Sequence, residues 1–147
     1  MEMLIPAAVI FGGYLFFRWM SRLRLGDHVM ENAGYDQLAS VSDLDAVFAS
    51  SREQARLLFL HDPWCPISAM ATRQIAQVDA YVATVDVSRQ HDLSREIERR
   101  TGIRHESPQL ILIRDGRAIW DASHSSIDEK SIKGVLESDA ANEGRAQ

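Results

Sequence analysis

The chain has 147 residues, of which 46% are hydrophobic and 25% are charged, so it can form one globular domain with a short appendage. Its net charge is −5, and residues 25–147 alone carry 13 basic and 20 acidic side chains. This acidic body argues against nucleic acid as the main partner, because binding to phosphates needs a basic surface.

Residues 3–17 (MLIPAAVIFGGYLFF) are uncharged and apolar, and three arginines follow them. A helix over residues 3–20 would span roughly 27 Å at ~1.5 Å per residue, which is close to the hydrocarbon thickness of a membrane. We therefore expect a single membrane anchor over residues 1–24, with the arginines keeping the following domain in the cytoplasm. A signal peptide fits less well, because the start carries Glu2 and no cation, and a soluble helix is a further alternative.

Residues 25–40 are mixed and aperiodic, which predicts a linker with a first short strand near residues 35–39. After them, compact apolar runs that are typical of buried strands alternate with helical patterns. The later expected strands are residues 56–61, 81–87, 110–113 and 118–120, and Asp115-Gly116 between the last two is a strong hairpin signal.

The expected helices cover residues 42–50, 66–77, 92–100 and 126–138. Ser42-Asp43 would cap the first, Gly102 would close the third, and Ser126 with Glu129 would form a capping box at the last. The polar residues 140–147 predict a disordered tail.

This order combines a parallel half, built from strand–helix units, with an antiparallel hairpin half. We therefore expect an α/β domain over residues 41–139, with a central mixed sheet flanked by helices. The arrangement resembles the thioredoxin-like fold, and the membrane helix would be an addition to it.

Cys65 is the one cysteine of the chain, and it lies between Trp64 and Pro66 where a strand gives way to a helix. Any disulfide must therefore join it to another molecule, and no Cys-rich metal site is possible. The start of a helix favours the thiolate, which is the nucleophilic form, and Pro66 suits the first helical turn. We interpret Cys65 as a reactive sulfur, with a small buried core cysteine as the alternative. The five histidines show no metal-ligand spacing, and we expect no metal site.

Ser68 lies where a dithiol enzyme would have its second cysteine, so it can donate a hydrogen bond to the sulfur but cannot resolve a mixed disulfide. Ser107-Pro108 opens an apolar strand; alone it indicates an edge turn, but in this topology it indicates a cis-proline loop beside the sulfur. Cys65 and Ser68 are the expected catalytic residues. The expected substrate-binding residues are Trp64, Pro66, Ser107 and Pro108.

Two other features lie near this site. His61 could shift the protonation of the thiol, although a histidine at a strand end is more often simply packed. Residues 101–108, which include Arg104 and His105, are expected to line the same end of the sheet.

Three segments carry a more specific resemblance: CPISA (residues 65–69), LSREIERRTGIRHESPQLILIRDGRAIWDASH (93–124) and IDEKSI (127–132). With these segments the chain resembles the monothiol bacilliredoxin family over roughly residues 36–137. The resemblance implies that Cys65 attacks a mixed disulfide between a client protein and bacillithiol, and that the small thiol moves onto Cys65. A free low-molecular-weight thiol or a reductase would then regenerate Cys65, with no bound cofactor. The alternative is a non-catalytic binding or redox-sensing module that uses Cys65 as an anchor or as a cluster ligand.

Overall fold

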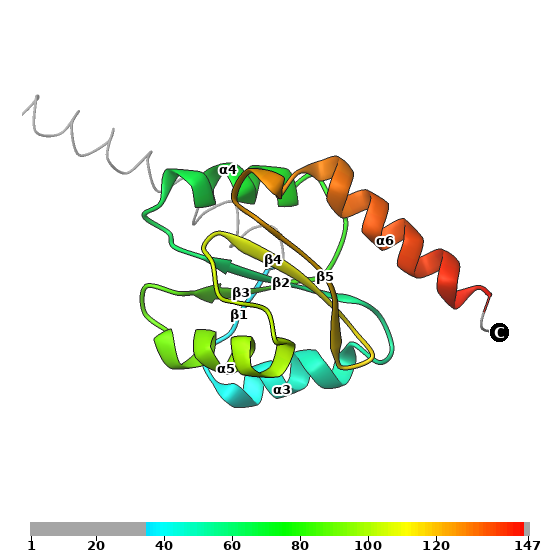
Figure 1. Cartoon of the computed structure of the whole chain (residues 1–147), viewed down its shortest axis with the longest axis horizontal. Helices are drawn as coiled ribbons and strands as arrows, with labels where there is room; N and C mark the ends of the chain where they lie inside the picture. Colours follow the sequence, from blue (N-terminus) through cyan, green and yellow to red (C-terminus); the bar gives the residue numbers. More distant parts are fainter. Residues whose placement is uncertain (1–34, 146–147) are drawn as a thin grey trace, which may run out of the picture.

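The computed structural model describes residues 35–145, and they form one sheet with helices on both sides (Figure 1). The five strands lie in the order β1-β3-β2-β4-β5. Strands β1, β3 and β2 are parallel, whereas β4 is antiparallel to both β2 and β5, so the predicted mixed sheet is confirmed. The strands are β1 (Asp36–Gln37), β2 (Arg56–His61), β3 (Val82–Asp86), β4 (Gln109–Arg114) and β5 (Arg117–Ser123).

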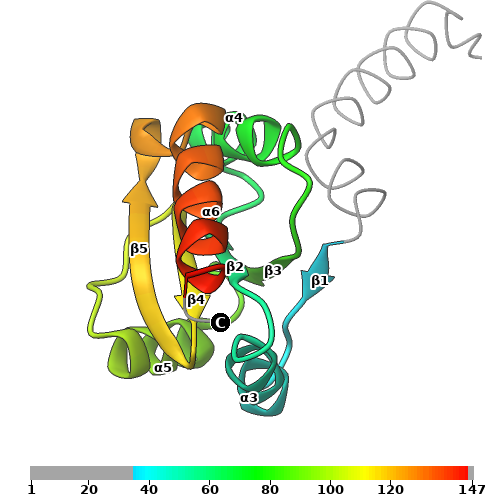
Figure 2. The same cartoon turned by 90° about the vertical axis from the view of Figure 1, so that its right-hand side faces the viewer.

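The helices cover the two faces of this sheet. Helices α4 and α6 lie on one face, and α3 and α5 lie on the other (Figures 1 and 2). The helices are α3 (Val41–Ser50), α4 (Pro66–Ile75), α5 (His91–Thr101) and α6 (Glu129–Glu143), with a short 3₁₀ turn, η1, at His124–Ser126.

Side-chain alternation along β2 and β3 assigns their residues to these two faces. Leu57 and Phe59 pack with Ala71 and Ile75 of α4, whereas the alternate β2 residues pack toward α3 and α5. Leu57 to Leu60 are at most 1% exposed, so β2 is covered on both faces, as its compact apolar run predicts.

The two predicted glycine turns are confirmed. Gly102 ends α5 in the left-handed conformation with a φ of 70°. Asp115 and Gly116 connect β4 to β5 with φ angles of 51° and 72°, a pair of positive values that a tight hairpin turn requires.

Two expected helix caps are corrected. Helix α3 is capped by Ser40 rather than by Ser42, because Ser40 and Asp43 satisfy each other's backbone N–H groups in a capping box. Helix α6 is capped by Asp128, whose side chain accepts from the Ser131 N–H, whereas Ser126 lies in the preceding 3₁₀ turn.

The disordered tail expected over residues 140–147 also starts earlier in the sequence prediction than the structure allows. Helix α6 continues to Glu143, so residues 140–143 are helical rather than disordered. Two of these four residues are alanine, the strongest helix former, and they extend a helix that has already formed.

The predicted fold class is wrong in its added transmembrane helix. Within residues 35–145, none of the helices is sufficiently long and apolar to cross a membrane. The segment expected to form that helix, residues 3–20, lies outside the described residues. The supported fold class is the thioredoxin-like α/β sheet, and the predicted single-pass membrane location is corrected with it.

Candidate active site

Cys65 lies at the junction between β2 and α4, as expected. It is the N-cap residue of α4, with extended φ and ψ angles of −87° and 121°, and Pro66 follows at the start of the helix. Its backbone is held on both sides: its N–H donates to the Asp62 carbonyl at 3.0 Å, and its carbonyl accepts from the Ala69 N–H at 3.1 Å. The side chain makes no capping hydrogen bond, and the residue is partly exposed. The sulfur is therefore placed at a helix start without serving as a structural cap.

Ser68 lies on the buried side of the first turn of α4 and is 2% exposed. Its Oγ accepts a hydrogen bond from the Asp62 N–H at 3.2 Å. This bond ties the helix start to the residue that follows β2, and the serine hydroxyl keeps its own proton for donation. Sequence reasoning identified Ser68 but not its contact with Asp62, because nothing in the local pattern indicates it.

The loop before Cys65 presents Trp64 to solvent. Trp64 is 68% exposed, and its N–H donates to Asp62 Oδ1 at 2.9 Å. Asp62 therefore organises the loop through its carbonyl, its N–H and its side chain, each bound to a different residue. Sequence reasoning noted Asp62 only as a neighbour of the site.

The Ser107–Pro108 peptide bond is cis, as the topology suggested. Gln109, the next residue, pairs with Leu60 in the antiparallel register of β2 and β4. The same register brings Pro108 to the level of His61, at the end of the sheet where β2 leads to Cys65. The Pro108 carbonyl accepts from the His124 N–H at 3.0 Å, which fixes this end of β4 to the end of β5.

The loop before Pro108 is only partly placed as expected. The His105 N–H donates to Glu98 Oε2 at 3.1 Å, and Glu98 lies seven residues into α5, roughly 10 Å along the helix. Helix α5 begins near the end of the sheet where Cys65 lies and runs away from it. A bond to Glu98, far along α5, therefore holds His105 away from the Cys65 end of the sheet. Gln109 shapes the rest of the loop, because its side chain binds the Glu106 N–H at 3.3 Å and the Arg104 carbonyl at 3.1 Å.

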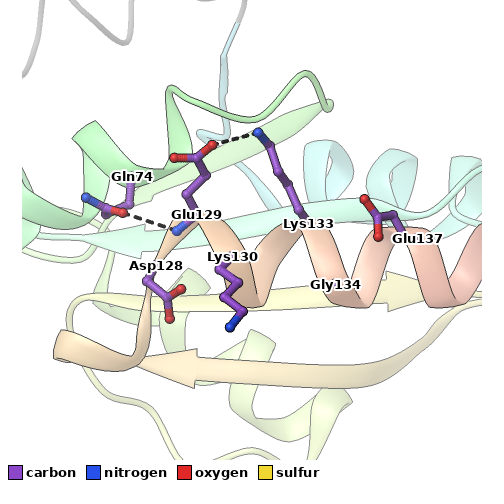
Figure 3. A pocket seen from close by; sticks show the side chains of 7 residues that line it. All are labelled: Gln74, Asp128, Glu129, Lys130, Lys133, Gly134 and Glu137. Carbon is purple, nitrogen blue, oxygen red and sulfur yellow. Dashed lines mark hydrogen bonds and ion pairs between the residues drawn. The ribbon is translucent and has the colours of Figure 1, made fainter.

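A surface pocket lies at the other end of α4, where α4 meets α6 (Figure 3). Gln74 Oε1 accepts from the Glu129 N–H at 3.1 Å, and Lys133 Nζ donates to Glu129 Oε1 at 2.6 Å. These polar groups pair with one another at the helix end opposite Cys65. Among the residues that the structure describes, no cluster of three or more His, Cys, Asp or Glu side chains could hold a metal ion.

Comparison with known families gives one match that spans most of this domain. The model of the family described as "Monothiol bacilliredoxin BrxC" matches residues 36–132, which run from β1 into α6 and include Cys65 and the cis-proline.

Solved structures give the same fold. A candidate oxidoreductase with a thioredoxin fold is 26% identical, with a TM-score of 0.65, over 71% of this chain and 96% of its own. A thioredoxin point mutant from Halobacterium salinarum NRC-1 is 25% identical, with a TM-score of 0.57, over 72% of this chain and 90% of its own. Fasciola hepatica thioredoxin, at 15% identity and a TM-score of 0.57 over 69% of this chain and 96% of its own, shares the fold. The chain thus belongs to the monothiol bacilliredoxin BrxC family, and it is a thiol oxidoreductase built on the thioredoxin fold.

Proposed function

We propose that the protein removes a low-molecular-weight thiol of the bacillithiol type from mixed disulfides on client proteins, with Cys65 as the nucleophile. The observation that carries the proposal is the position of Cys65 as the partly exposed N-cap of α4, with no structural bond from its side chain. In this position the helix dipole and the free N–H groups of the first turn favour a thiolate.

The reaction consists of two thiol–disulfide exchanges. The Cys65 thiolate attacks the sulfur of the small thiol, a new disulfide forms to Cys65, and the bond to the client cysteine breaks. The client leaves as a thiolate and takes up a proton. A second small thiol then attacks the Cys65 adduct as its thiolate, which releases the oxidised small-thiol dimer and restores the Cys65 thiolate. No further oxidant or reductant is needed.

The neighbouring residues have supporting roles in this proposal. Ser68, whose Oγ accepts from the Asp62 N–H, can direct its own proton toward the Cys65 thiolate. Trp64 offers an exposed aromatic surface to the client, and Pro66 starts the helix beneath the sulfur. Ser107 and Pro108 shape the substrate groove through their backbone, at the same end of the sheet.

A de-thiolation assay tests the proposal. A client protein with one bacillithiol–cysteine mixed disulfide is incubated with the wild type or with Cys65→Ser, and the masses of both proteins are followed. The wild type should free the client and gain the mass of one small thiol, whereas Cys65→Ser should leave the client unchanged. A client that stays thiolated with the wild type would favour the binding or sensing module instead.

A further inference from the structure

Two buried ionisable side chains lie next to each other at the end of the sheet that leads to Cys65. His61 ends β2 and Asp86 ends β3, and they are direct partners in the parallel register of these strands. They are only 6% and 4% exposed. Ionisable groups are costly to bury unless they are paired, and the reaction described above uses neither of them.

Both side chains lie on the face of the sheet that α4 covers. His61 alternates with Leu60 and shares a face with Phe59, on which its ring stacks at a centroid distance of 5.1 Å. Asp86 alternates with Val85, which packs on the opposite face. Neighbouring strands are about 4.8 Å apart, so the imidazole and the carboxylate are neighbours.

The first turn of α4 is bonded to the loop that directly follows His61. The Ser68 Oγ, which faces the sheet, accepts from the N–H of Asp62, the residue directly after His61. Helix α4 thus starts over the end of β2, and its N-cap residue is Cys65. The buried imidazole is thus on the face of the sheet that α4 covers, at the strand end from which the chain continues to Cys65.

The charged groups around His61 come from β3 with the turn that follows it, and from the loop after β2. From β3, Asp86 is fixed by Ser88, whose N–H and Oγ bond to Asp86 Oδ1 at 3.0 and 2.5 Å, and its Oδ2 lies 3.6 Å from Arg89 Nε. From the loop after β2, Asp62 directs a carboxylate oxygen to the Trp64 N–H.

The buried residues of α4 are uncharged: Ser68, Ala71, Thr72 and Ile75. From β4, Gln109 is neutral, and it pairs with Leu60. Asp86 is therefore the buried carboxylate paired with His61 in the strand register, and Cys65 follows four residues after His61.

We infer that His61, oriented by Asp86, holds the proton of the active site. The imidazole takes the proton of the Cys65 thiol, and the resulting imidazolium stabilises the thiolate. When the client thiolate leaves, it takes up this proton, so proton and electron pairs balance with no added reactant. His61 is a positioning and proton-holding residue here, and the inference rests on the proposed function of Cys65.

The test is the pH profile of Cys65 alkylation by iodoacetamide, read by intact mass. His61→Gln should move the midpoint of the profile upward by about one pH unit, because an opposite charge nearby is lost. At pH values well below both midpoints this is a loss of about tenfold in rate, and at pH 10 the two rates should converge. Asp86→Asn should move the midpoint in the same direction.

The matched control is His91→Gln, at an exposed residue that starts α5, and it should keep the wild-type profile. Coincident wild-type and His61→Gln profiles would overturn the inference.

If His61→Gln does not fold, NMR titration of the wild-type His61 imidazole decides. Blocking Cys65 with iodoacetamide removes the thiolate and should lower the His61 midpoint by about half a pH unit or more. An unchanged midpoint would overturn the inference. Neither measurement uses a client, so failure of de-thiolation with an intact His61 effect would reject only the proposed substrate.

Discussion

In the proposed function, Ser68 occupies the position that decides which disulfides the protein can process. It is three residues after Cys65, on the buried side of the helix start, and its Oγ is held by the Asp62 N–H. With a hydroxyl in this place, an adduct on Cys65 cannot be released internally and must wait for an external thiol.

Ser68→Cys should therefore add some reduction of protein disulfides, because a second sulfur three residues on can approach the first. The measurement is turbidity from insulin reduction with dithiothreitol as the reductant. The matched control is Ala76→Cys, which places an exposed thiol just past the other end of α4. Equal rates for the two variants would show that the position of the second thiol does not matter.

At the scale of the elements, α3 depends on its capping box. Ser40 Oγ accepts from the Asp43 N–H at 3.2 Å, and Asp43 Oδ2 accepts from the N–H groups of Ala39 and Ser40 at 2.8 and 2.9 Å. These backbone and side-chain bonds, first that from Ala39, lower the pKa of Asp43.

Two alanine variants distinguish the observed cap from the one that the local sequence suggests. Ser40→Ala should lower the free energy of unfolding by about 1 kcal/mol, which is usual for loss of a serine N-cap. Ser42→Ala, at an exposed helical residue, should change it by less than about 0.5 kcal/mol. Urea denaturation followed by circular dichroism measures both, and the reverse order would place the cap at Ser42.

Helix α5 carries an acid-sensitive ion-pair network that also reaches α3. Glu96 accepts from Arg99 and Arg100 at 2.6 to 2.8 Å, and Arg100 also bonds to Asp45 of α3 at 2.6 Å. The hydrogen bond from Arg99, followed by that from Arg100, lowers the pKa of Glu96 to about 2.

Since the pKa of Glu96 is lower in the fold than in the unfolded chain, its stabilisation is complete above about pH 4.5 and disappears as the pH falls through about 2. Glu96→Gln should thus destabilise the protein at pH 6, and this difference should shrink steadily toward pH 2. Urea unfolding of both proteins at several pH values measures it. A difference that stays constant with pH would show that the charge of Glu96 contributes nothing.

The patterns that were predicted correctly are local ones. The apolar run at residues 56–61 gives the bounds of β2, and the glycines at 102 and 116 give their turns. Helix caps were less predictable, because Ser40 and Ser42 are each followed three residues later by an aspartate, and only the structure shows that Ser40 is the cap.

The candidate site likewise combines features that the local sequence predicts with contacts that it does not predict. Cys65 could be placed at a helix start from Pro66 and the preceding strand alone. The contact of Ser68 with Asp62, and the position of Asp86 beside His61, depend on how α4 and β3 dock onto β2. Such contacts come from strand register and helix packing, which one sequence does not specify.

At the scale of the whole molecule, a single thiol at one end of the sheet implies that small-thiol mixed disulfides and protein disulfides react differently with the protein. The structure joins a thioredoxin-like sheet to a single cysteine, so the protein has the fold of a disulfide reductase without its second sulfur. Exchange with a small-thiol adduct needs only the one sulfur. Reduction of a protein disulfide leaves a protein-sized adduct on Cys65 that this chain cannot resolve.

The most direct measurement compares these two substrates under the same conditions. Wild-type protein is mixed with a client carrying one small-thiol mixed disulfide and, separately, with insulin, and both the products and the mass of the enzyme are followed. The account predicts rapid release of the client thiol with one small-thiol adduct on Cys65, and negligible reduction of insulin. Efficient reduction of insulin by the wild type, or de-thiolation that persists in Cys65→Ser, would contradict it.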